Sequence, residues 1–131
     1  MRRRGPYQLQ AAISAAHCEA PSASATDWPY VVSLYDALLD AVPSPVIEIN
    51  RAVAVGMARG PAAGLALLDA IAPTRDLERY QPRYAARADL LRRERRFEEA
   101  ACEYARAIAV TSNEIERAYL AGRQRDCADR V

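Results

Sequence analysis

Two arginines carry the most evident binding chemistry of this chain. Arg51 and Arg87 stand 36 residues apart, at equivalent places in two similar segments of the chain. Helical repeats of this length usually have a leucine-like residue at that place. A guanidinium in such a place needs a partner, and its planar fork suits a carboxylate. One interpretation is that each arginine pairs within the chain and fixes the register of its helix. The candidate carboxylates are Glu48, Asp69, Asp89 and Glu103.

A second interpretation assigns the arginines to a partner protein. They would then face a groove and receive a carboxylate from a segment of the partner. Trp28 and Tyr30 flank a proline, and aromatic side chains at such a place could anchor a partner or pack one helix on the preceding one. The residues of this predicted partner-binding groove are Trp28, Tyr30, Asn50, Arg51, Arg87 and Asp89.

The charged run 92–96 reads Arg-Arg-Glu-Arg-Arg and lies where one predicted helix ends and the next begins. Four arginines could contact nucleic acid or an acidic protein surface. Cations at a helix C-terminus are favourable in themselves, however, so the sequence favours a solvated capping role for the run.

Catalytic and metal chemistry find little support. His17 and Cys18 are adjacent, but neighbouring helical residues point about 100° apart, and the chain has no second histidine. The three cysteines, Cys18, Cys102 and Cys127, show no CxxC spacing, so neither a disulfide framework nor a zinc site is indicated. We therefore predict no catalytic residue, no metal and no cofactor, and a reducing, cytoplasmic location.

These residues must be positioned by helices, because the chain contains a helical repeat. The two segments superimpose with an offset of 36 residues, and a partial third copy precedes them by 33 residues. A period in the mid-thirties is typical of tetratricopeptide (TPR) helix pairs, which bind far more often than they catalyse. The coincident pairs are Arg51/Arg87, Ala52/Ala88, Val55/Leu91, Gly64/Ala100, Leu68/Tyr104 and Ile71/Ala107.

The predicted fold is all-α, a TPR-like stack of three helical hairpins followed by a C-terminal capping helix. We expect one domain over residues 1–131, with hairpins at about 6–43, 45–72 and 83–111 and the end helix at about 114–124. Small residues at positions 52, 64, 88 and 100 would let paired helices approach closely. The second helix is expected to bury Val31, Leu34, Tyr35, Leu38 and Val42.

Turn and cap signals set the expected boundaries. Residues 20–26 predict an irregular loop, and residues 74–82 a linker with one helical turn. Thr26 or Asp27 would cap the second helix, and Ser44 the third. Asn113 and Glu116 have the capping-box spacing. The end helix would cover the open end of the stack with Ile115 and Tyr119.

Composition limits the function classes. With 131 residues, 51% of them apolar, the chain can bury a core. Its formal net charge is only +1, so we expect no direct DNA binding by this segment. No stretch is apolar enough to predict a membrane span.

Several separated motifs resemble one family. They are the runs 5–13 (GPYQLQAAI), 26–28 (TDW), 50–55 (NRAVAV), 60–65 (GPAAGL) and 113–117 (NEIER). Together they resemble the TPR-like C-terminal extension of a group of extracytoplasmic-function (ECF) sigma factors of bacterial RNA polymerase. The regions with which such factors bind polymerase and promoter DNA are not in this sequence.

The resemblance implies a protein-interaction domain that contacts sigma core regions, RNA polymerase or a regulatory protein during transcription initiation. The alternative is a free-standing helical scaffold, or a homodimer joined through its end helix, unrelated to transcription. An enzyme would require acidic or histidine side chains that converge in one pocket.

Overall fold

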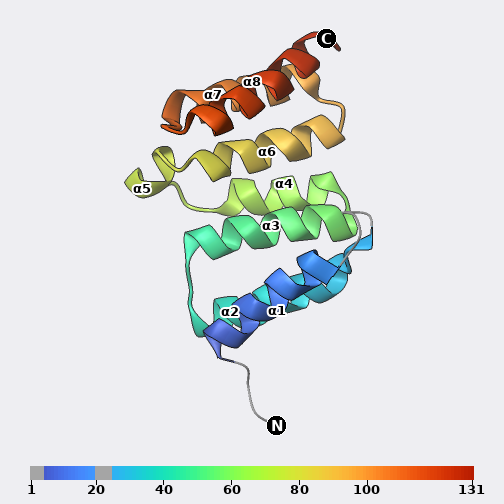
Figure 1. Cartoon of the computed structure of the whole chain (residues 1–131), viewed down its shortest axis with the longest axis vertical. Coiled ribbons are helices and arrows are strands. Elements are labelled where there is room, and N and C mark those ends of the chain that lie inside the picture. Colours follow the sequence, from blue (N-terminus) through green and yellow to red (C-terminus); the bar gives the residue numbers. More distant parts are fainter. Residues whose placement is uncertain (1–4, 20–24) are drawn as a thin grey trace. The chain divides into compact units, whose positions relative to one another are not determined.

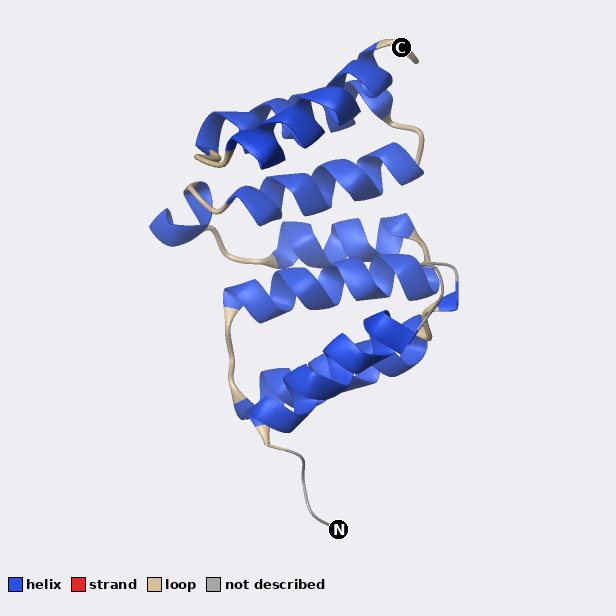
Figure 2. Ribbon diagram, in the orientation of Figure 1, coloured by secondary structure: helices blue, strands red, loops and turns tan. Residues whose placement is uncertain are grey.

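In a computed structural model, the described part of the chain, residues 5–19 and 25–131, consists of helices joined by loops and contains no strand (Figures 1 and 2). This confirms the predicted all-α fold class. The helices are α1 (Pro6–Glu19), α2 (Trp28–Ala41), α3 (Pro45–Arg59), α4 (Pro61–Ala70), α5 (Arg75–Glu78), α6 (Gln81–Arg93), α7 (Phe97–Val110) and α8 (Glu114–Ala128). Most of the loop expected at 20–26 lies outside the described residues.

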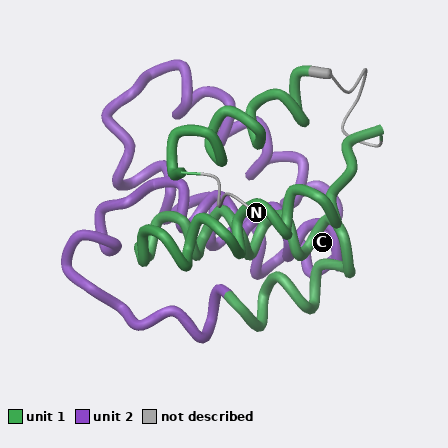
Figure 3. The backbone as a smooth tube through the Cα atoms, turned by 90° about the horizontal axis from the view of Figure 1, so that it is seen from below, with its two compact units in different colours: residues 1–67 green, residues 68–131 purple. Residues whose placement is uncertain are grey.

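The chain divides into two compact units, residues 1–67 and 68–131, coloured separately in Figure 3. The boundary falls inside α4. In the first unit α2 packs against α1 and α3, and in the second α7 packs against α6 and α8. In each unit, helices that follow one another in the chain thus pack together, as in a helical repeat.

The first unit has a core of aliphatic side chains from α1, α2 and α3. Leu9 and Ile13 of α1 belong to this core, and Ala63 and Leu67 of α4 pack against it. The buried face of α2 is confirmed at Val31, Leu34 and Leu38, whereas Tyr35 is only partly buried. Val42 was wrongly included, because the helix ends at Ala41, and its side chain is 40% exposed.

The second unit is built around Tyr104, the largest of its fully buried side chains. Ala88, Ala100 and Ala107, on α6 and α7, are also fully buried. Small side chains therefore do occupy the places where two helix backbones approach, as the repeat predicted.

The end helix buries a different face from the one predicted. Ile115 is 83% exposed and Tyr119 is 56% exposed, whereas Leu120 and Cys127 are buried. Adding the repeat offset of 36 to two α6 residues, Tyr84 and Leu91, gives positions 120 and 127. Helix α8 thus buries the face that the first helix of a further repeat would bury.

Helix starts follow the predicted caps with two corrections. Asp27 accepts a bond from the Tyr30 amide at 3.2 Å, as expected, but the Ser44 side chain makes no capping bond at the start of α3. At α8, Glu116 does not reach back to the Asn113 amide. It accepts a bond from the Thr111 hydroxyl at 2.7 Å, and that hydroxyl accepts from the Asn113 amide at 3.3 Å. A threonine thus joins the two ends of the expected capping box.

Asn113→Ala is expected to destabilise the protein by about 1 kcal/mol. The Asn113 carboxamide accepts bonds from the amides of Ile115 and Glu116 at 2.9 and 3.0 Å, and alanine leaves both donors to solvent. Urea unfolding measures the change. The control is Asn50→Ala, at an exposed position within α3, where alanine favours the helix. Equal midpoints for the two variants would contradict a capping role.

Candidate functional site

Both repeat arginines form ion pairs within the chain. Arg51 on α3 pairs with Asp36 on α2. Arg87 on α6 pairs with Asp69 on α4 at 3.1 Å and with Glu103 on α7 at 3.5 Å. Each arginine therefore joins the first helix of one hairpin to the second helix of the hairpin before it.

The pairing carboxylates repeat as the arginines do. Asp36 stands 33 residues before Asp69, the same offset that relates the first repeat copy to the second. Asp69 and Glu103 were among the expected carboxylates, but Asp36 was not. Extending the offset to the acidic residues of the second helix in each hairpin would have found it.

Arg87 also lines a hollow of about 380 Å³ within the second unit. Its wall combines apolar side chains with two further arginines and the two carboxylates that Arg87 contacts. The lining residues are Leu68, Asp69, Ile71, Pro73, Arg83, Tyr84, Arg87, Glu103 and Arg106. Glu103 is only 5% exposed and also pairs with Arg106 at 3.0 Å, so charge in this hollow is largely balanced.

Asp89 takes part in the packing of the second unit. It accepts a hydrogen bond from the Tyr104 hydroxyl, which in turn accepts one from Arg92 Nε at 3.3 Å. Burial and the Asp89 carboxylate raise the pKa of Tyr104. Asp89 thus has a structural partner that the groove interpretation did not foresee.

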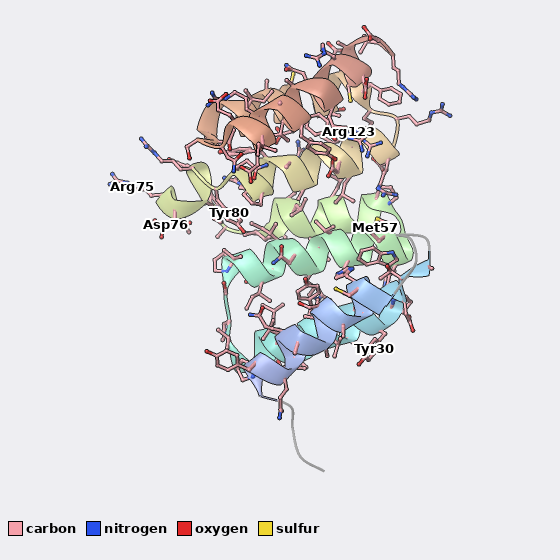
Figure 4. All side chains as sticks on the ribbon, viewed as in Figure 1. Tyr30, Met57, Arg75, Asp76, Tyr80 and Arg123 are labelled. Atoms are coloured by element: carbon pink, nitrogen blue, oxygen red, sulfur yellow. The ribbon has the colours of Figure 1, made fainter. Side chains whose placement is uncertain are left out.

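The other groove residues belong to the first unit. Trp28 packs against the core of that unit, and its ring lies edge-on to the ring of His17 on α1, with centroids 5.2 Å apart. This contact joins α2 to α1, the packing role considered for the tryptophan. Asn50 is exposed, and Tyr30, labelled in Figure 4, is 41% exposed.

A second hollow, the arginine pocket, has a volume of about 360 Å³ in the second unit. Its arginines come from the end of α6, from the turn between α6 and α7, and from α8 and the residues that follow it. The lining residues are Arg92, Arg93, Arg95, Phe97, Arg123, Asp126, Cys127 and Arg130.

Within residues 5–19 and 25–131, none of the five pocket arginines forms an ion pair with a carboxylate. Arg123 Nε donates to the Tyr119 hydroxyl at 3.2 Å, and Arg130 lies over the ring of Phe97, 5.4 Å from its centroid. The remaining arginine of the charged run, Arg96, differs from them. It pairs with Glu94 and Glu99 and lowers the pKa of the Glu99 carboxyl.

Arg95 has an uncommon backbone conformation, with φ of 64°. Its amide donates to the carbonyl of Arg92 at 2.9 Å, and the next amide, of Arg96, donates to the carbonyl of Leu91 at 3.0 Å. These two bonds make a Schellman turn, in which glycine is the usual residue at the left-handed position. An arginine there costs on the order of 1 kcal/mol.

The sequence-based interpretation of the run 92–96 was incomplete. Helix capping accounts for Arg92 and Arg93, which lie in the last turn of α6. It does not explain why these arginines line one pocket with arginines of α8 and the residues after it. A signal was present, because Arg123 stands 36 residues after Arg87 and is the third arginine of the repeat. The carboxylate position fails to repeat, since Ala105 follows Asp69 by 36 residues.

Cysteine and acidic side chains do not form a metal site in the described residues, where no cluster of three potential ligands occurs. Cys18 and Cys102 are exposed, and Cys127 is buried on α8, where desolvation raises the pKa of its thiol. None of the described helices is long and apolar enough to cross a membrane.

The chain is similar to a segment of a longer bacterial protein. The chain is 43% identical over 119 residues to an uncharacterized protein of Rhizobium meliloti (strain 1021). The match covers 91% of this chain but only 28% of that relative. No protein-family model matches the chain, and no solved structure matches it significantly.

Proposed function

We propose that this chain is a protein-interaction domain of the kind that extends ECF sigma factors, acting in transcription initiation rather than in catalysis. The observation that carries the proposal is the ordered set of motifs between residues 5 and 117 that resembles those extensions. The partner would be the sigma core regions, RNA polymerase or a regulatory protein in the cytoplasm.

Two observations support a binding role. The helices form successive hairpins, and equivalent ion pairs join the first helix of one hairpin to the second helix of the hairpin before it. Proteins built from such helical repeats commonly bind partners on their surfaces. In the Rhizobium relative the matching segment is less than a third of the polypeptide, so a module of this sequence occurs there within a longer protein.

Within this proposal, we assign the partner to the hollow around Arg87. The hollow around Arg87 offers apolar walls with arginines and carboxylates at its edge, which suits a peptide side chain of mixed character. For a partner carboxylate to reach Arg51 or Arg87, it must compete with Asp36 or Asp69. Both aspartates are more than half exposed on their side chains, so such an exchange costs little.

Replacing Arg51 by alanine is expected to abolish partner binding while leaving the melting temperature nearly unchanged, because its partner Asp36 is more than half exposed. The measurement is a pull-down of the chain against isolated sigma regions and against polymerase, with thermal unfolding in parallel. The control is Arg75→Ala on α5, an exposed arginine outside both hollows.

Two results would reject parts of this proposal. Loss of stability together with loss of binding would assign Arg51 to helix register alone. No capture by either sigma regions or polymerase would remove the transcription role and leave the free-standing scaffold or homodimer.

A further inference from the structure

The side chains that line the arginine pocket carry an excess of positive charge. Five arginines and one aspartate line it, a formal charge of +4. The whole chain carries +1, so the remaining residues carry a net negative charge of three. Charge of one sign gathered in one concave place raises the local concentration of oppositely charged ligands.

The repeat explains why one of these cations is unpaired. Arg51 and Arg87 each have an aspartate from the preceding hairpin, but the corresponding position for Arg123 is Ala105. The arginine of the repeat has been kept in α8 while its carboxylate is absent. Its guanidinium contributes to the pocket instead of to helix register.

The backbone of Arg95 is an independent observation that also indicates a functional role for the pocket. Glycine would fit the left-handed backbone of the Schellman turn without strain, yet an arginine lies there with its side chain exposed and lining the pocket. Strain kept at a position that lines a site is commonly linked to the function of that site.

We propose that the arginine pocket binds the phosphate groups of a small polyphosphate-bearing anion. Guanidinium forks bind phosphate oxygens in pairs, and a chain of linked phosphates brings several negative charges into one small volume. The pocket, at about 360 Å³, lies within the size range of small-ligand sites. This inference concerns a different surface from the proposed protein-binding hollow and does not depend on it.

Two other anionic partners fit the observations less well. Carboxylates on one face of an extended peptide are separated by two residues, about 7 Å, so few of them enter one pocket together. Duplex DNA requires a basic stripe or face, whereas the chain as a whole is nearly neutral and the residues outside this pocket carry a net negative charge.

The test is calorimetric titration of the full chain with sodium triphosphate and, separately, with ATP at equal ionic strength. We expect saturable binding that weakens as salt is added. Equal affinities would show that the phosphate groups alone are recognised, and tighter binding of ATP would show that the nucleoside also contributes. Both results support the proposal, and they distinguish an inorganic from a nucleotide ligand.

Two variants and one control test the location. Arg95→Gly and Arg123→Gln are each expected to weaken triphosphate binding about ten-fold. Arg95→Gly should do so without lowering the melting temperature, because glycine suits the turn. Arg75→Gln removes the same charge from α5 and should bind as the parent protein does. Figure 4 shows Arg75 and Arg123 toward opposite ends of the second unit.

Three outcomes would overturn the inference. The first is no measurable heat or thermal stabilisation with millimolar triphosphate. The second is an equal loss of affinity in Arg75→Gln, which would indicate general charge attraction. The third is binding of a duplex oligonucleotide or a polyglutamate peptide by a chain that does not bind triphosphate.

Discussion

Tyr104→Ala is expected to cost about 3–5 kcal/mol, much of the stability of a unit of this size. Tyr104 is fully buried on α7, the helix that packs against both α6 and α8. Alanine would leave a cavity between these helices and remove the hydroxyl that bonds to Asp89. Urea unfolding followed by circular dichroism measures the loss. A cost below about 1 kcal/mol would show that the packing of α6, α7 and α8 does not depend on this ring.

Tyr104→Phe separates the hydroxyl from the ring. It keeps the aromatic volume but leaves Asp89 without its donor, so we expect a smaller loss of about 1–3 kcal/mol. The pH dependence provides a second readout. The pKa of Tyr104 is raised above its ordinary value of 10.0, so the folded state holds the proton more tightly than the unfolded state. Its contribution to stability is therefore complete below about pH 10 and decreases above it, and Tyr104→Phe should remove that decrease.

The sequence was most informative where local chemistry decides the outcome. The N-cap residues Asp27 and Asn113 predicted where two helices begin, and the spacing of small residues predicted several buried positions. These features act within one or two helical turns, so they can be identified without knowing how distant segments meet. The single helical turn expected near Arg75 is present as α5.

The buried face predicted for α8 was wrong, because it depended on how this helix packs against α7 rather than on local signals. Ile115 and Tyr119 are large and lie near the start of the helix, which favoured them as covering residues. The face that α8 presents to α7 is instead the one that buries Leu120 and Cys127. Treating α8 as the first helix of a further repeat would have given this register, since the offset of 36 residues holds there too.

The two candidate sites differ in the same respect, that is, in whether a pattern in the sequence indicates them. Pairing of Arg87 within the chain was one of two interpretations of the repeat, and Asp69 and Glu103 were two of the four carboxylates considered for it. The arginine pocket was not predicted, because it is assembled from the end of α6 and the end of α8, about 30 residues apart in the chain. Charge counted along the sequence gives +1 and hides a local excess of one sign.

The second large expected effect is a loss of stability when a small residue between two packed helices is enlarged. Ala100 on α7 is fully buried, as is Ala88 on α6, the helix against which α7 packs. Ala100→Leu adds three carbon atoms where no space is left, so the helices must separate or adopt strained rotamers. We expect a loss of about 1–3 kcal/mol or more, measured by urea unfolding.

The matched control for this variant is Ala105→Leu on the same helix. Position 105 is exposed, so the same substitution there should leave stability within about 0.5 kcal/mol. Leucine and alanine have similar helix propensities, and the difference between the two variants therefore reports packing rather than helix formation. If Ala100→Leu were as stable as Ala105→Leu, the helices would tolerate a larger separation, and small residues would not be what sets the spacing of the repeat.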